Sequence, residues 1–262
     1  MRKFVKPLVA LTVVVGLAVA QAQEPVYGGE AVIAITAAPP GWDPSASTSQ
    51  EIPRVVYGNV YEGLVIFDRD GSIVPALATD WETSEDGLTW TFSVRDGVKF
   101  HDGSDLQLSD IVARFERARD PESGHTNHAY YAAITEVSAD EDANTVTFTL
   151  SEPRASLLFD LARGDSVIYP AALQESQASQ PIGTGPFTFA DYIEGSEVRL
   201  ERFDDYWNAE LPYLDSAVFR IMSDSNSRFA ALQSGDIDVI GVALAPEQYM
   251  QLASNPELQG TE

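Results

Sequence analysis

The chain has 262 residues, enough for one large domain or two modest ones. Hydrophobic residues make up 44% of it, which excludes a disordered chain. The absence of cysteine excludes disulfides, cysteine-bound metals and thiol nucleophiles. With 40 acidic and 16 basic residues the net charge is −24, and a surface of that sign repels nucleic acid and anionic lipid.

Residues 1–22 have the pattern of a cleavable secretory signal. Arg2, Lys3 and Lys6 precede an apolar run over residues 8–20, which ends in small residues that suit cleavage. The run is shorter than the roughly 20 residues of a membrane-spanning helix, so an uncleaved anchor is the less favoured alternative. Because no cysteine follows the run, we expect a soluble protein of the periplasm rather than a lipoprotein.

Removal of residues 1–22 changes the charge further. The remaining chain has 13 basic and 40 acidic residues, a net charge of −27, and Lys99 is its sole lysine. Solubility is the simpler explanation of this charge, and a cationic ligand is the alternative. The acidic residues are spread along the whole sequence, so they do not locate a site.

The pattern of apolar and turn-forming residues in the first part of the chain predicts short strands, turns and helices. Asp70-Gly71 is a tight-turn signal between two apolar runs, and alternation of apolar residues with threonine indicates half-buried strands. Ser109 is placed to cap a helix. In chain order we expect strands at 31–36, 65–67, 73–74, 88–94 and 146–150, and helices at 51–62, 109–119 and 155–162.

The second part begins with a loop, Gly183-Thr184-Gly185-Pro186, whose glycines and proline indicate an unusual backbone conformation. Gly235 is placed to end a helix. Strands and helices are mixed without a strict β-α-β rhythm, which predicts a mixed α/β fold. In chain order we expect strands at 198–201, 214–221 and 237–242, and helices at 224–233 and 246–253.

Several motifs resemble one family. Residues 84–103 read SEDGLTWTFSVRDGVKFHDG, and the stretch from Asp86 to Gly103 is specific. Further matches are VYGNVYEGLV at 56–65, IVPALATDWE at 73–82, GTGPF at 183–187, YW at 206–207 and LQSGDID at 232–238. The chain resembles the extracellular solute-binding proteins of ABC importers, family 5, the peptide/nickel-binding class.

The resemblance implies a two-lobed clamp of the type II periplasmic-binding-protein kind. Residues 23–45 and 181–262 would form lobe I, and residues 46–180 an inserted mixed subdomain. Lobe II would be missing, so we expect the sequence to be an N-terminal fragment. The implied partners are permease subunits of the importer and a small ligand, which is a di- or oligopeptide, a nickel chelate, a sugar or an opine. The resemblance implies a monomer with no cofactor.

Four residues are candidates for ligand contact. The resemblance places Trp42, Tyr130 and Arg163 at cleft-facing positions, and Val242 is expected to line the cleft through its backbone. The guanidinium of Arg163 suits a carboxylate. For the two aromatic residues core packing is the alternative, and for Arg163 a solvated surface position is the alternative.

The three histidines do not indicate catalysis. His101 lies in a turn-rich segment with no nucleophile nearby, so a structural role is favoured. His125 and His128 have metal-ligand spacing but no third ligand, and a solvated loop is favoured. We therefore expect a binding protein with no catalytic or metal-ligating residues. The alternatives are a secreted hydrolase or metal-dependent enzyme, and a fragment that is inert because it cannot close on a ligand.

Overall fold

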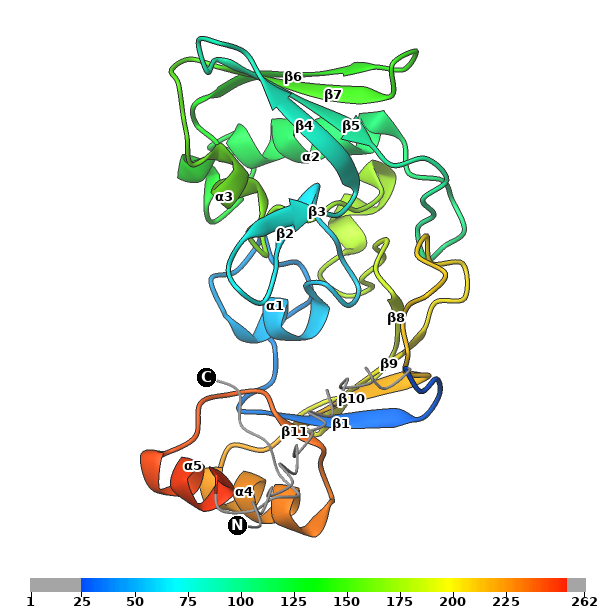
Figure 1. The fold of residues 1–262 in the computed structure, drawn as a ribbon, viewed down its shortest axis with the longest axis vertical. Helices are drawn as coiled ribbons and strands as arrows, with labels where there is room; N and C mark the ends of the chain where they lie inside the picture. The colour runs from blue at the N-terminus through cyan, green and yellow to red at the C-terminus, as the bar shows by residue number, and fades with distance from the viewer. Residues whose placement is uncertain (1–24, 254–262) are drawn as a thin grey trace, which may run out of the picture.

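The structure is a computed structural model, and it describes residues 25–253. Two β-sheets lie at opposite ends of an elongated molecule, with short helices and a small hairpin between them (Figure 1). This arrangement confirms the mixed α/β class. Within residues 25–253, no helix is long and apolar enough to cross a bilayer. The secretory signal assigned to residues 1–22 lies outside the described residues.

The first sheet is four-stranded and antiparallel, in the order β4-β5-β7-β6. The predicted alternation is confirmed, because Phe92 pairs with Val146 on the buried face while the hydroxyls of Thr91 and Thr147 meet on the other face, 3.2 Å apart. The mostly exposed β4 and β6 carry no such alternation, which is why the sequence did not predict them. The strands are β4 (Ala78–Thr83), β5 (Thr89–Val94), β6 (Ile134–Asp140) and β7 (Thr145–Leu150).

Helix α2 (Leu108–Arg119) packs against β6 and β7. It begins one residue before the predicted start, so the expectation that Ser109 caps it is wrong. Gln107 is the cap: its extended backbone precedes the helix, and its N–H donates to a side-chain oxygen of Asp110 at 3.0 Å. This reciprocal capping box satisfies backbone groups that the first helical turn leaves unpaired.

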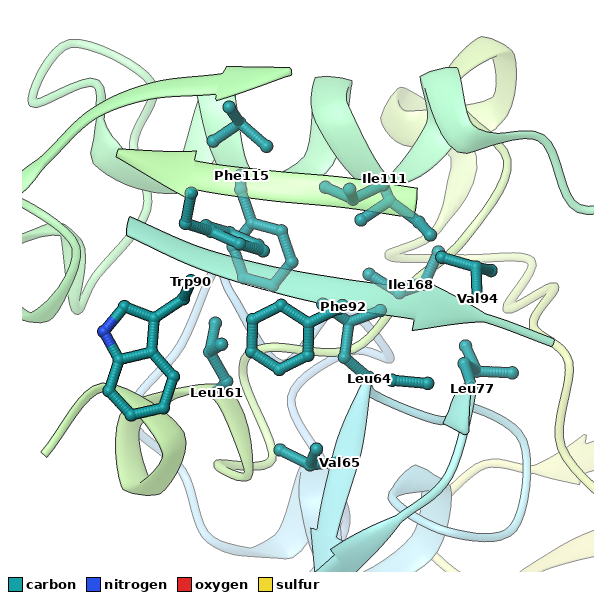
Figure 2. Close-up of a cluster of buried hydrophobic side chains, with 14 of the residues drawn as sticks. Leu64, Val65, Leu77, Trp90, Phe92, Val94, Ile111, Phe115, Leu161 and Ile168 are labelled. Atoms are coloured by element: carbon teal, nitrogen blue, oxygen red, sulfur yellow. The ribbon is translucent and has the colours of Figure 1, made fainter. Parts of the chain in front are cut away.

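The core between α2 and this sheet is built on three phenylalanines. The ring of Phe148 lies 5.4 Å from that of Phe92 and 4.9 Å from that of Phe115, edge to face in both pairs. Leu161 from α3 (Leu157–Leu161) and Leu64 close the same cluster (Figure 2). Burial of each such side chain contributes about 1.5–3 kcal/mol, so this cluster anchors the loops attached to it.

The second sheet has the order β11-β1-β10-β9-β8 and joins the two ends of the described chain. β1 lies between β10 and β11 and is parallel to both. Helix α4 (Ser225–Ser234) connects β10 to β11, capped by Asp224 and ended by Gly235 at φ +78°, as predicted. The strands are β1 (Glu30–Ile35), β8 (Phe187–Ile193), β9 (Glu197–Arg202), β10 (Ser216–Ile221) and β11 (Val239–Ile240).

Several elements are shorter than predicted. Helix α1 (Glu51–Val56) ends six residues before the expected boundary, because Tyr57 is extended and Gly58 turns the chain at φ +72°. Helix α3 and strand β11 are likewise shorter. The hairpin predicted at Asp70-Gly71 is present. The remaining elements are β2 (Val65–Phe67), β3 (Ile73–Pro75), α5 (Pro246–Ala253) and two 3-10 turns, His128–Tyr130 and Ala171–Ser176.

The loop at 183–186 passes against the backbone of residues 59–61. A Cβ atom on Gly183 would lie 2.1 Å from the carbonyl oxygen of Val60, and one on Gly185 would lie 2.2 Å from that of Asn59. The glycines therefore serve close backbone approach, and neither has a positive φ. In this position the N–H of Gly185 donates to the carbonyl of Val60 at 2.9 Å.

Buried Glu62 fixes the same loop from the other side. Its carboxylate accepts hydrogen bonds from Thr184 Oγ1 at 2.9 Å, Tyr206 Oη at 2.7 Å and Trp207 Nε1 at 3.0 Å. Burial raises the pKa of the Glu62 carboxyl above its ordinary value, and the three donors act in the opposite direction. One side chain thus joins three segments that are far apart in the sequence.

The domain boundaries at 45/46 and 180/181 stay a prediction. The four-stranded sheet is drawn from residues 78–150, and the five-stranded sheet from β1 and from residues 187–240. Helix α1 packs through Ile52, Val55 and Val56 into the hydrophobic cluster that includes Phe187, Leu200 and Phe219 of the five-stranded sheet. These buried contacts extend the five-stranded sheet's core to α1.

Candidate functional site

An open hollow of about 450 Å³ lies beside α1, where the loop after β1 faces the segment after α3. Both charged residues of its lining, Arg163 and Asp165, come from that second segment. The whole lining is Pro44, Ser47, Thr48, Ser49, Gln50, Pro53, Tyr57, Phe67, Asn127, Phe159, Arg163, Gly164 and Asp165.

The charged groups of the hollow form a short chain of hydrogen bonds. Arg163 donates through Nε to Asp165 Oδ1 at 3.1 Å, and Asn127 donates through Nδ2 to Asp165 Oδ2 at 2.7 Å. The Asp165 side chain is 7% exposed, whereas that of Arg163 is 26% exposed. Both carboxylate oxygens are occupied, so the accessible charge in the hollow is the guanidinium.

Tyr130 packs on the same guanidinium. The Cζ atom of Arg163 lies 4.1 Å from the centre of the Tyr130 ring, a distance that gives a cation–π contact. Tyr130 is 40% exposed, so it is not a core residue. Arg163 is neither fully solvated nor buried, because an aromatic ring covers one face and a carboxylate holds one edge. The structure thus brings two of the four predicted residues together.

The lining of the hollow also includes aromatic residues. Phe159 is 54% exposed and packs edge to face on Phe67, with ring centres 5.0 Å apart. Tyr57 also lines the hollow, and its hydroxyl donates to the carbonyl of Ala162 at 2.5 Å. A solute seated here would meet both a cationic group and exposed ring surface.

Trp42 lies away from this hollow. It is 4% exposed and packs between Phe189 and Tyr192, with ring centres 4.7 and 5.2 Å away. Its backbone N–H donates to the carbonyl of Ala178 at 3.2 Å. This burial corresponds to the packing alternative given for Trp42, and a role as a ligand wall stays a prediction.

Val242 follows β11 and is half-buried. The N–H of Gly241 donates to the carbonyl of Ala34 at 3.1 Å, so the chain still follows β1 as it reaches this point. Val242 does not line the hollow around Arg163. Its contact with a ligand stays a prediction.

His125 differs from the sequence expectation. It was assigned to a solvated loop, but it is 2% exposed and faces Arg114 from the middle of α2. Burial and the Arg114 charge lower its pKa to about 4, so it is neutral at pH 7. Across residues 25–253 no group of three or more His, Cys, Asp or Glu side chains is arranged to hold a metal ion.

Arg163 is the one lining residue of the hollow that was a candidate from the sequence, and three of the residues that were missed matter most for the site. Asp165 occupies a position two residues after Arg163, and this spacing of opposite charges after an apolar helix was the available signal. Asn127 had none, because it is 38 residues from the carboxylate that it contacts. Phe159 lies in the helix predicted at 155–162, and α3 turns it outward.

The fold is similar to that of periplasmic binding proteins, over about half of their length. Residues 72–262 match the family described as bacterial extracellular solute-binding proteins, family 5 Middle. The chain therefore belongs to the family 5 extracellular solute-binding proteins, as the sequence motifs predicted.

Curated relatives cover most of this chain. The glutathione-binding protein GsiB of Pectobacterium atrosepticum is 34% identical over 229 residues, which are 86% of this chain and 44% of GsiB. GsiB of Salmonella paratyphi A is 32% identical over 222 residues, 83% of this chain and 42% of GsiB. The chain thus spans less than half the length of the curated relatives that it matches.

Solved structures also match most of this chain over about half of their own length. The periplasmic binding protein AgaA of A. tumefaciens R10, in complex with agropinic acid, superimposes with a TM-score of 0.80 at 32% identity, over 87% of this chain and 46% of AgaA. The periplasmic binding protein DppA of Helicobacter pylori, in complex with the peptide STSA, gives a TM-score of 0.75 at 30% identity, over 88% of this chain and 50% of DppA.

Proposed function

We propose that this chain belongs to a protein that captures a small solute outside the inner membrane and delivers it to an ABC importer. The observation that carries the proposal is the Arg163 guanidinium, which is oriented by Asp165 and Tyr130 at the edge of an open hollow. Permease subunits are the partners that membership of the family favours.

The class of ligand follows from the N–H groups of Arg163 that have no acceptor within the described residues. Among residues 25–253, Nε is the one nitrogen of the Arg163 guanidinium with a hydrogen-bond acceptor, which leaves the N–H groups of both Nη atoms for a ligand. Two parallel N–H groups match the geometry of a carboxylate. We therefore infer a carboxylate-bearing solute, although the net charge of the chain favours cations.

The relatives support this class. Glutathione, agropinic acid and the peptide STSA, named for GsiB, AgaA and DppA, all carry carboxyl groups. The aromatic side of the hollow, Phe159 with Phe67, gives a surface for the rest of such a molecule. Trp42 and Val242 remain proposed contacts from other parts of the lobe.

We infer the clamp arrangement from membership of the family, and the division of the sheets supports the split of this chain into lobe I and an inserted subdomain. Residues 23–45 and 181–262 contribute the five-stranded sheet, and residues 46–180 contribute the four-stranded sheet. In a clamp, closure of a second lobe excludes water and strengthens polar contacts to the ligand. On one lobe alone we expect weak binding.

Titration calorimetry tests the proposal. Reduced glutathione, agropinic acid and Ser-Thr-Ser-Ala are titrated into the purified chain, and the solutions are analysed afterwards by mass spectrometry. We expect at least one to bind and to be recovered unchanged. Arg163→Met should weaken its binding about tenfold or more, because a charge-assisted hydrogen bond contributes about 1.5–3 kcal/mol.

The control is Arg69→Met, the same change at an exposed residue of the β2–β3 turn, and it should leave binding unchanged. Absence of heat with all three solutes would favour an inert lobe. Turnover of a solute at enzymatic rates would favour the hydrolase alternative. Equal binding by Arg163→Met and the unaltered chain would contradict the site.

A further inference from the structure

The hollow is supported from behind by two buried residues that do not line it. Arg114, from the middle of α2, and His125, six residues after its end, are each 2% exposed. Arg114 Nη2 lies 3.3 Å from His125 Nε2. Burial of a guanidinium destabilises the folded chain unless the group donates to hydrogen-bond acceptors. The acceptors of Arg114 therefore show which parts of the chain it fixes.

Arg114 holds the main chain of the segment that carries Arg163. Its Nε donates to the carbonyl of Val167 at 2.9 Å, and its Nη2 donates to the carbonyl of Asp165. Both acceptors are backbone atoms of the turn that follows Arg163. The segment is therefore fixed at two points, and one of them is the carbonyl of Asp165 itself.

His125 holds the other partner of Asp165. Its Nδ1 accepts a hydrogen bond from the backbone N–H of Asn127 at 3.1 Å. The Asn127 side chain then donates to Asp165 Oδ2 at 2.7 Å. The ring of His125 packs edge to face on Tyr131, 5.3 Å between centres, so its orientation is itself fixed.

We propose that Arg114 and His125 are positioning residues for ligand binding: they hold Asp165 and Asn127, and these in turn hold the Arg163 guanidinium in a binding-ready orientation. Neither residue touches the ligand. A guanidinium fixed before binding loses less conformational entropy on contact with a carboxylate. The inference rests on the proposed function of the hollow, but its test needs no ligand.

The experiment measures the side-chain Nε–H resonance of Arg163 by ¹H–¹⁵N NMR in the whole chain, assigned by its loss in Arg163→Lys. In the unaltered protein we expect a resolved signal, shifted by the Tyr130 ring and protected by Asp165. In Arg114→Met it should move to the position of an unstructured arginine and broaden by solvent exchange. Arg119→Met, which removes a partly exposed arginine of the same helix that pairs with Glu116, is the matched control and should leave the signal in place.

A second pair of variants separates positioning from folding. His125→Leu removes the acceptor for Asn127 and should release the Arg163 signal, whereas His125→Asn supplies an acceptor oxygen and should retain it. The two His125 variants test the positioning proposal on their own if Arg114→Met does not fold. A wild-type Arg163 signal in folded Arg114→Met or His125→Leu would overturn the proposal, as would equal loss in His125→Asn and His125→Leu. In the unaltered chain, a resolved Arg163 signal together with no binding of the three solutes would count against the proposed function and not against the positioning of the guanidinium.

Discussion

The backbone N–H of Gly183 donates a hydrogen bond to Nδ1 of His101 at 3.3 Å, while Nε2 of the same ring lies 2.9 Å from the carbonyl of Gly185. Because Nδ1 accepts, the proton resides on Nε2 and the ring is neutral. His101 thus joins the turn after β5 to the loop that leads into β8. The residue that invited a catalytic interpretation has a structural role, as the sequence analysis favoured.

This pair predicts a loss of stability in acid. Burial lowers the pKa of His101 from 6.5 to about 4. The unfolded chain therefore binds a proton before the folded chain does, so the stabilisation is complete above about pH 6.5 and is lost as the pH falls toward 4. The free energy lost through His101 is at most about 3 kcal/mol. His125, which faces Arg114, Asp165 and Asp43, contributes in the same range.

Urea unfolding at pH 7, 6, 5 and 4.5 measures the effect. The unaltered chain should lose stability steadily over this range, and His101→Asn should start lower but fall less steeply. Identical pH slopes for the two proteins would show that His101 does not titrate as described.

The three hydrogen bonds to Glu62 predict that a small substitution there lowers the stability of the fold. Glu62→Gln keeps the shape of the side chain but brings an NH₂ group toward three donors, so at least one buried donor loses its acceptor. We expect a loss of about 2–3 kcal/mol in the free energy of unfolding. Glu82→Gln, on exposed β4, is the control and should change stability by less than about 0.5 kcal/mol. Urea titration at pH 7 compares them, and equal stability would refute the role of Glu62.

The close approach of Gly185 to the backbone of Asn59 predicts that position 185 has no room for even one methyl group. Gly185→Ala would place Cβ 2.2 Å from the carbonyl oxygen of Asn59, so the loop must move away from the segment that it pairs with. We expect destabilisation of about 2 kcal/mol or more. At Gly41 the nearest atom to a new Cβ is the Ala178 carbonyl oxygen at 3.5 Å, so Gly41→Ala should cost much less. Thermal unfolding of the two variants would contradict this account if their midpoints were equal.

Periodic sequence patterns predicted the buried parts of this fold well. Trp90, Phe92 and Val94 alternate with polar residues and are buried as a strand face, and helix α5 has the predicted bounds. Pattern analysis failed in the mostly exposed strands β4 and β6, whose few buried residues, such as Ile134 and Val137 of β6, do not alternate regularly with exposed ones. It also extended α1 too far, because apolar residues at helical spacing continue past Gly58, where the backbone turns.

The site was harder to predict than the fold. Arg163 and Tyr130 were both predicted from family resemblance, and the structure adds that they contact each other, while their role in ligand binding stays a prediction. The network behind them was not foreseen, because its members come from α2, the loop after it and the segment after α3. Long-range contacts such as Asn127 with Asp165 leave no periodic signal in a single sequence.

The central claim is that the Arg163 guanidinium receives a ligand carboxylate. A crystal structure of the chain with the tightest-binding of glutathione, agropinic acid and Ser-Thr-Ser-Ala tests it most directly. We predict a ligand carboxylate about 2.7–2.9 Å from the Nη atoms of Arg163, with Asp165 still on Nε. A ligand bound elsewhere on the lobe, with the hollow beside α1 empty, would contradict it.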